Sequence, residues 1–354
     1  MIASRILSIS VSLFGLLQGF QSLAPEDPTN PVRVTLKTET AFETNIFENY
    51  QNPTDAWNTQ HWLRLQWQQS GPRDFIRIHS LSGCNCYPAQ FTENKLSQSL
   101  ALLQRHHFNR KFSGQLKADF FYKSWIHDNV HRYFTLKTAY NFALPIRNWE
   151  ISWGPTLYLN RYHFENQFHS NQYGLQLWGH KGFGPHWVLM TELGYTSIDY
   201  PYRTVFQVEQ YAQNPTLQKD QLVQGKIGIE FHDQCIFGLS LHLLHLHSNS
   251  SYAGYFGYSL NCYGTQRFGK TVVQLIAQLY FKHYSQELLS HLIAYFPDPE
   301  QNIQNQLLIG WERPMCRERL SLTGKAAYMR NESRYSGIYY EKWLITLGLQ
   351  YRLR

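Results

Sequence analysis

The sequence has no long apolar run beyond its first residues. After the stretch from Ile6 to Leu17, nothing is long and apolar enough for a transmembrane helix, so any membrane span must consist of strands. The first run follows Arg5, has the length of a signal-peptide core and is too short and isolated to span a bilayer. We therefore expect a signal peptide over residues 1–24 and an exported region over residues 25–354.

Cysteine is also scarce. Five cysteines, an odd number, occur without framework spacing, at Cys84, Cys86, Cys235, Cys262 and Cys316. This excludes a disulfide scaffold. Cys84 and Cys86 could ligate a soft metal or cross-link, but no nearby pair completes a four-ligand zinc site. We interpret both as incidental loop thiols and expect neither a metal nor a cofactor.

Charge and hydropathy are low as well. Charged residues make up 16% of the chain and the mean hydropathy is -0.43. That value counts against a helical membrane protein, yet it suits a barrel, in which only alternate residues face lipid. No linker-like stretch divides the 354 residues, so they predict one unit. The abundance of aromatic residues, 16%, fits two interfacial girdles.

Alternation of apolar and polar residues is the dominant pattern. Between Lys111 and Trp125, the even-numbered positions are mostly apolar and the odd-numbered ones mostly polar, with Phe121 as the exception. A soluble sheet can show one such strand, but here the pattern repeats along the whole chain. The repetition predicts an all-β fold, an antiparallel transmembrane β-barrel in which one face of each strand is apolar and the other is wet.

Sixteen strands are expected, with boundaries good to a few residues. Their predicted ranges are Val32–Thr40, Thr59–Gln68, Asp74–Ser82, Lys95–Gln104, Lys111–Lys123, Tyr133–Ala143, Trp149–Asn160, Asn171–His180, His186–Ile198, Leu222–His232, Ile236–His245, Gly254–Gly264, Thr271–Lys282, Asn305–Glu312, Leu320–Tyr328 and Trp343–Arg352. Pro155 in the seventh predicts a bulge or a shorter strand.

The connections between these strands alternate between short and long. Those after even-numbered strands are turn-like, whereas the regions from Phe42 to Asn58, Tyr200 to Asp220 and Tyr284 to Gln304 are long. An even-stranded barrel with both chain ends in the periplasm has this arrangement. The third long connection, residues 284–304, is expected to contain a short amphipathic helix that caps or constricts the barrel.

Two motifs carry a resemblance to a known family. The chain's last residues resemble the terminal insertion signal of bacterial outer-membrane β-barrel proteins, with Thr346, Gly348, Tyr351 and Leu353 in the polar, glycine, aromatic and hydrophobic positions. The residues from Glu43 to Phe47 are similar to an Asn-Ile-Phe turn of barrels attached to some secretion and surface-lipoprotein systems. The resemblance implies an outer-membrane location and recognition by the barrel-assembly machinery.

The polar face is expected to line a pore. The candidate pore-lining residues are Lys111, Lys117, Asp119, Lys123, Lys137, Lys226, Glu230, Lys282, Lys325 and Arg352. Excess positive charge concentrates anions, and the net charge of +7 has the same sign, so a weak anion preference is one hypothesis. The alternative is that these cations pair with acids or bind lipopolysaccharide phosphates at the rim.

Enzymatic interpretations are weaker. The segment from His245 to Asn249 partly resembles the His-x-Ser-Asn pattern of outer-membrane lipid hydrolases, but adjacent His247 and Ser248 point to opposite faces of a strand. Asp199 and Asp220 are the acidic candidates for a surface protease, and nothing distinguishes them from ordinary loop carboxylates. We therefore expect no catalytic residues.

Three function classes follow from these observations. A passive pore for small solutes comes first, because sixteen strands enclose room for an aqueous channel. A gated export or uptake barrel with a periplasmic partner is second, and a barrel enzyme is third. The expected partners are outer-membrane lipids and lipopolysaccharide and the assembly machinery, with the periplasmic protein added under the second class and no nucleic acid under any.

Overall fold

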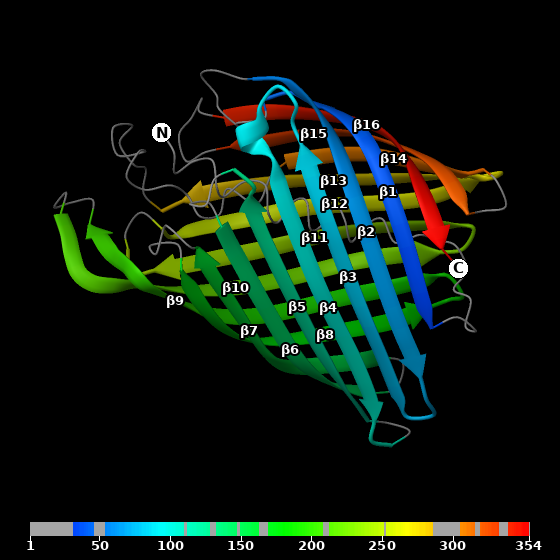
Figure 1. The fold of residues 1–354 in the computed structure, drawn as a ribbon. Coiled ribbons are helices and arrows are strands. Elements are labelled where there is room, and N and C mark those ends of the chain that lie inside the picture. The colour runs from blue at the N-terminus through cyan, green and yellow to red at the C-terminus, as the bar shows by residue number, and fades with distance from the viewer. Residues whose placement is uncertain are drawn as a thin grey trace.

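The chain forms a closed antiparallel barrel of sixteen strands (Figure 1). The computed structural model describes residues 31–45, 54–109, 112–127, 132–146, 149–162, 169–207, 212–250, 253–285, 305–315, 319–332 and 339–353. The strands are β1 (Val32–Glu43), β2 (Ala56–Ser70), β3 (Asp74–Cys86), β4 (Lys95–His107), β5 (Ser113–Trp125), β6 (Arg132–Ile146), β7 (Trp149–Tyr162), β8 (Ser170–Phe183), β9 (Trp187–Gln207), β10 (Ala212–His232), β11 (Cys235–Ser248), β12 (Tyr255–Phe268), β13 (Thr271–Tyr284), β14 (Asn305–Pro314), β15 (Leu320–Glu332) and β16 (Tyr339–Leu353). A 3-10 turn, η2 (Phe91–Glu93), lies between β3 and β4.

Each of the sixteen predicted strands corresponds to one observed strand, in the same order. Every strand pairs with its sequence neighbours, and β1 closes the barrel by pairing with β16 from Val34 opposite Leu353 to Glu43 opposite Leu344. Nearest-neighbour pairing follows from the short connections, which allow only adjacent antiparallel strands to meet. The predicted fold class is confirmed.

The two ends of the barrel differ as the sequence predicted. β1 begins and β16 ends at the rim that carries the short connections, such as residues 71–73 and 233–234. The connections at the opposite rim are mostly longer, and that rim also carries η2. Among the described residues, no helix is long and apolar enough to cross a membrane.

One predicted loop is wrong. Within the region from Tyr200 to Asp220, residues 200–207 and 212–220 continue β9 and β10, which are each 21 residues long. β8 pairs with β9 only as far as Asp199 and β11 pairs with β10 only as far as Asp220, so the described part of the two strands extends past its neighbours as a hairpin, visible at the left in Figure 1. Pro201 lies where the β9–β10 register is irregular and no pair forms, a position that tolerates proline.

Pro155 also differs from expectation. β7 is neither bulged nor shortened there, since it pairs continuously with β8 on one side and keeps its register with β6 on both sides of the proline. Only the pairs of Gly154 and Pro155 with β6 are missing. A Cβ on Gly154 would lie 1.7 Å from the carbonyl oxygen of Tyr140, so glycine at 154 allows the two strands to approach closely at this interruption.

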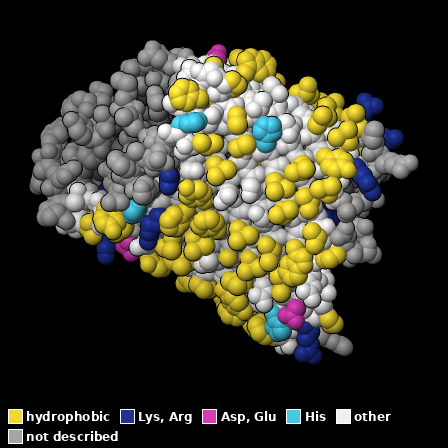
Figure 2. Space-filling model, viewed as in Figure 1, with side chains coloured by type: hydrophobic (Ala, Val, Ile, Leu, Met, Phe, Trp, Pro, Cys, Tyr) yellow, Lys and Arg dark blue, Asp and Glu magenta, His cyan; other side chains and the backbone are white. Residues whose placement is uncertain are grey.

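The pairing of residues between strands shows which side chains point into the barrel and which point outward, because directly paired residues lie on the same side of a sheet. The outer positions of β16 are Ile345, Leu347, Leu349, Tyr351 and Leu353, and all are exposed. Figure 2 shows apolar side chains over much of the visible outer surface. Aromatic pairs such as Tyr328 with Trp343 and Phe112 with Phe142 lie towards the two rims. This surface matches a lipid-facing band bounded by aromatic girdles.

Several predictions fall outside the described residues. These are the signal peptide over residues 1–24, Lys111, Cys316, the Asn-Ile-Phe positions Ile46 and Phe47, and most of the connection 284–304. Asn45 is described, and its φ of 51° lies in the left-handed region that asparagine tolerates. Its backbone N–H donates to Asp55 and its side-chain amide donates to the Glu341 carbonyl, so it joins the ends of β1, β2 and β16.

Candidate functional site

The inner face holds every described candidate from the sequence. Paired positions place the following residues inside the barrel: Lys117, Asp119, Lys123, Lys137, Lys226, Glu230, Lys282, Lys325 and Arg352. They are spread around the barrel and along its axis instead of forming one cluster. Their role as pore-lining groups stays a prediction.

Charge on the inner face is unevenly divided between two walls. The cationic wall, β1–β6 with β14–β16, carries inward Arg33, Lys37, Arg64, Arg77, Lys95, Arg105, Lys117, Lys123, Lys137, Lys325, Lys342 and Arg352 against Glu39, Glu43, Asp119 and Glu312. The balanced wall, β7–β13, carries inward Lys226, Arg267 and Lys282 against Glu150, Glu192, Asp220 and Glu230. The net positive charge of the interior therefore comes from one side.

Some of these cations are neutralised by neighbouring carboxylates. Lys37 Nζ lies 2.7 Å from Glu39 Oε1, and Lys342 Nζ lies 3.0 Å from Glu43 Oε2. Arg352 forms an ion pair with Glu312 near the short-turn rim. The alternative to a selective pore, that inner cations pair with acids, thus holds for this subset.

Other inner lysines form no ion pair. Lys117, Lys137, Lys226 and Lys325 make no ion pair and no hydrogen bond with any described residue. Carboxylates still lie nearby, since Asp119 is paired with Lys137 across β5 and β6 and Glu192 with Lys226 across β9 and β10. Three of the four lysines belong to the cationic wall, where cations outnumber acids, so the net field of that wall raises the local concentration of anions.

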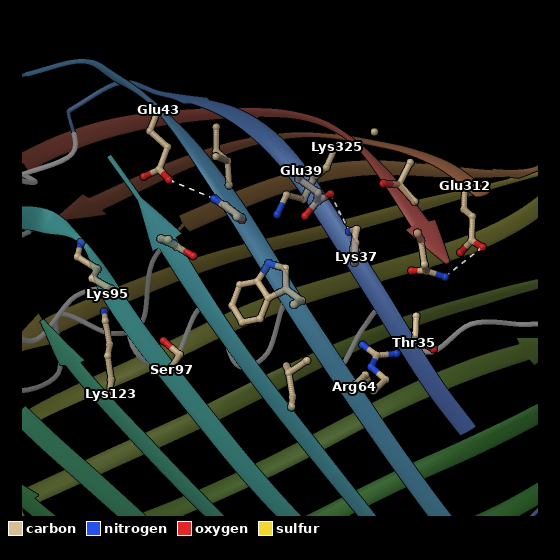
Figure 3. A pocket seen from close by; sticks show the side chains of 18 of the residues that line it. Thr35, Lys37, Glu39, Glu43, Arg64, Lys95, Ser97, Lys123, Glu312 and Lys325 are labelled. Atoms are coloured by element: carbon tan, nitrogen blue, oxygen red, sulfur yellow. Dashed lines mark hydrogen bonds and ion pairs between the residues drawn. The ribbon is translucent and has the colours of Figure 1, made fainter. Parts of the chain in front are cut away.

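A pocket on the cationic wall is lined by several of the charged side chains of that wall (Figure 3). It encloses about 1350 Å³ of empty space, open solvent included, between β1–β5 and β14–β16. Its lining is amphipathic, since Trp62 and Phe121 lie among Lys37, Glu39 and Lys325. Gly83 makes room for the Trp62 ring, because a Cβ there would lie 2.0 Å from a ring carbon.

Glu43 is the centre of a buried polar network at the long-loop end of this pocket. Its carboxylate accepts hydrogen bonds from Asn58 Nδ2 at 2.8 Å and from the Tyr87 hydroxyl at 3.1 Å, besides its ion pair with Lys342. Glu43 is only 5% exposed, so these partners replace its water. The network joins β1, β2, β16 and the segment after β3, and it braces the seam where the first and last strands meet.

Two lysines, Lys95 and Lys123, lie over the ring of Trp125 beside this network. Lys95 and Lys123 extend from adjacent strands, and their ammonium groups lie 5.4 and 4.7 Å from the ring centroid of Trp125. Lys95 is also 3.4 Å from Glu93 of η2. The ring and the carboxylate reduce the repulsion between the two lysines and hold both side chains against the wall.

The comparisons with known proteins establish the fold. No family model and no curated protein matches the chain. Among solved structures, CdiB from Acinetobacter baumannii aligns over 92% of this chain and 60% of its own length, with 8% identity and a TM-score of 0.51. The outer membrane protein opdK from Pseudomonas aeruginosa aligns over 91% and 98% with 10% identity and a TM-score of 0.41, and a BenF-like porin from Pseudomonas fluorescens Pf-5 over 91% and 99% with 9% identity and a TM-score of 0.41.

CdiB thus shares this fold, while the chain spans about three fifths of CdiB's length. The closed barrel, its apolar outer surface and the sorting of its connections agree with that similarity. The chain is a membrane-spanning β-barrel.

The inner face of the barrel is less uniformly wet than the alternation predicted. Inward Ala41, Leu308, Ala327, Met329 and Leu344 form a buried apolar cluster. Leu246, Tyr255, Ile198 and Tyr200 form another near the long-loop rim of β9–β12. The prediction of a wholly polar inner face was wrong at these two clusters. Lipid requires the outward residues to be apolar, but an inward residue needs to be polar only where water reaches it.

The predicted assembly signal occupies β16, and its four residues divide between the two faces. Tyr351 and Leu353 point outward. Thr346 and Gly348 point inward, where the Thr346 hydroxyl donates to Glu39 at 3.3 Å. A Cβ on Gly348 would lie 2.4 Å from the Thr38 carbonyl oxygen, so the glycine lets β16 close against β1. These contacts give the two inward positions a role in the folded barrel.

Of the residues considered for catalysis, Ser248 and Asp220 come together, but His247 and Asp199 do not join them. Ser248 pairs with Asp220 and donates a 2.5 Å hydrogen bond to it, while neighbouring His247 is exposed on the other face, as the sequence argument required. Asp199 and Asp220 lie on opposite faces of the β9–β10 ladder. Cys84 and Cys86 are free thiols on the outer face of β3, so their assignment to a loop was wrong. In the described part of the chain, no group of three potential ligands could hold a metal ion.

The residues that the sequence missed are Glu43, Lys342 and Tyr87. Glu43 and Lys342 lie just beyond predicted strand ends, since β1 and β16 extend further than their apolar alternation, and Tyr87 directly follows the extended β3. The sequence did contain a signal for Glu43. Lys37, Glu39 and Glu43 are all at odd-numbered positions, so they share one face of the first strand.

Proposed function

We propose that this outer-membrane barrel is a pore for passive diffusion of small solutes with a weak preference for anions. The observation that carries the proposal is the excess of inner cations over acids on the cationic wall, which includes Lys117, Lys137 and Lys325, none of them in an ion pair. Sixteen-stranded barrels are wide enough to contain an aqueous channel, and fixed positive charge beside such a channel favours anions.

Single-channel conductance of the detergent-folded protein in a planar bilayer tests this proposal, with the reversal potential measured under a salt gradient. Stable steps with anion-selective reversal are expected. Cation selectivity would contradict the proposed anion preference but would still support a pore. A control reversal potential at high ionic strength should move towards zero, because salt screens the lysines.

A gated export or uptake barrel, working with a periplasmic partner, is the alternative. It predicts electrical silence from protein that heat-modifiable migration shows to be folded. The same assay therefore separates the two functions. Binding of lipopolysaccharide and recognition of Thr346, Gly348, Tyr351 and Leu353 by the assembly machinery belong to either proposal, since every outer-membrane barrel needs them.

A further inference from the structure

Among the described residues, the apolar outer surface is most broadly interrupted on β1–β4. Here the outward positions hold Thr38, His61, Ser80, Ser82, Cys84 and Gln98, which we call the outer polar patch. Thr38, His61 and Cys84 are directly paired across β1, β2 and β3, as are Ser82 and Gln98 across β3 and β4. In Figure 2, white side chains interrupt the yellow surface in the upper part of this face.

The outer polar patch lies at the depth of the lipid band. Trp57 and Trp67 both point outward on β2, at opposite ends of the strand, and mark the two girdles there. At about 3.3 Å per residue and a tilt of about 45°, they are about 23 Å apart along the membrane normal, close to the height of such a band. His61 lies between them, so the patch faces hydrocarbon unless a protein covers it.

The side chains of the outer polar patch indicate which kind of surface could cover it. No Lys, Arg, Asp or Glu occupies an outward position of β1–β4 between the two girdles, so the patch offers no counter-charge to lipid phosphates. Every side chain in it is both a hydrogen-bond donor and an acceptor. Thr38 Oγ1 and His61 Nδ1 already lie 3.3 Å apart, which shows the type of bond these groups make.

Such a surface complements its own two-fold image, because each donor and acceptor finds the same groups on the opposing copy. The short side chains of Ser80, Ser82 and Cys84 also allow two strands to approach closely, as small residues do at interfaces within membranes. We propose that the barrel self-associates as a two-fold dimer through the outer polar patch. This inference is independent of whether the barrel conducts.

Cysteine cross-linking tests the proposal directly. Two variants each keep a single cysteine, Cys84 or Cys262, with the others replaced by serine. Both thiols are half-buried on the outer face, but Cys262 lies on β12, far from the patch in strand order. Mild oxidation in lipid vesicles is expected to give a dimer from the Cys84 variant and none from the Cys262 variant. Equal cross-linking, or none at Cys84, would overturn the proposal.

A second measurement separates the interface from barrel stability. The double substitution Ser82→Leu with Gln98→Leu makes the patch resemble the rest of the lipid-facing surface. It is expected to weaken dimerisation by about tenfold, the scale of one or two hydrogen bonds within a membrane, without loss of heat-modifiable migration. The mass of the protein in nanodiscs measures the oligomeric state. If the double variant is still a dimer to the same extent, or if the unaltered protein is a monomer, the patch is not the interface.

Discussion

The two inner walls of this barrel are built from the same alternating strands, yet only one carries an excess of charge. On the cationic wall, lysines and arginines outnumber acids, whereas on the balanced wall acids and cations are similar in number. Strand alternation therefore determines that a face is polar, while the sign of its charge is a separate property. A solute crossing between such walls meets a transverse field, because positive charge is concentrated on one side.

The cationic wall also contains the closing seam, so its buried charges have a structural role that the balanced wall lacks. Replacing Glu43 by Ala should destabilise the barrel by about 3–5 kcal/mol, because Lys342 would be left buried without its counter-charge. The matched control is Glu341→Ala, which removes an exposed pair with Arg330 at 3.9 Å and should cost less than about 1 kcal/mol. Denaturant unfolding in detergent compares the two, and equal losses would contradict the role of the Glu43 network.

Backbone packing at the seam gives a second contrast. Gly348→Ala should cost about 1–3 kcal/mol, because its Cβ would meet the Thr38 carbonyl oxygen of β1 at 2.4 Å and force the strands apart. Gly264→Ala on β12 is the control, since the nearest atom there is 3.8 Å away. Thermal loss of the compact form on a gel measures both. Similar melting temperatures would show that the seam adjusts to the methyl group.

The strands and their faces were predictable, but the extent of the strands was not. Lipid imposes alternation only within its own thickness, so the pattern gave the middle of each strand and the inward position of Lys117 or Lys325. Glu43 and Lys342 lie beyond that band, where hydropathy no longer constrains alternate positions. The β9–β10 hairpin was missed for the same reason. Ion pairing depends on rotamers and cross-strand register, neither of which a single sequence reports.

Reversing the charge of three lysines that form no ion pair should remove the electrical difference between the walls. The triple variant Lys117→Glu, Lys137→Glu and Lys325→Glu changes three positive groups into negative ones, and we expect selectivity to turn from anions to cations. A change of about tenfold in the permeability ratio corresponds to about 1.4 kcal/mol, a modest effect for charges in partly screened water. Reversal potentials measure it, and an unchanged ratio in a conducting, folded variant would contradict the lysine hypothesis.

The smallest effect is expected from the balanced wall. Lys226 faces Glu192 across β9 and β10, and Gln224 donates to that carboxylate at 3.1 Å, so the field of Lys226 is partly offset although no ion pair forms. Lys226→Gln should therefore shift the permeability ratio by less than about twofold, whereas Lys325→Gln should shift it further because its wall has surplus positive charge. Reversal potentials at low salt compare the two single variants. If Lys226→Gln had the larger effect, selectivity would depend on local position in the channel instead of the imbalance between the walls.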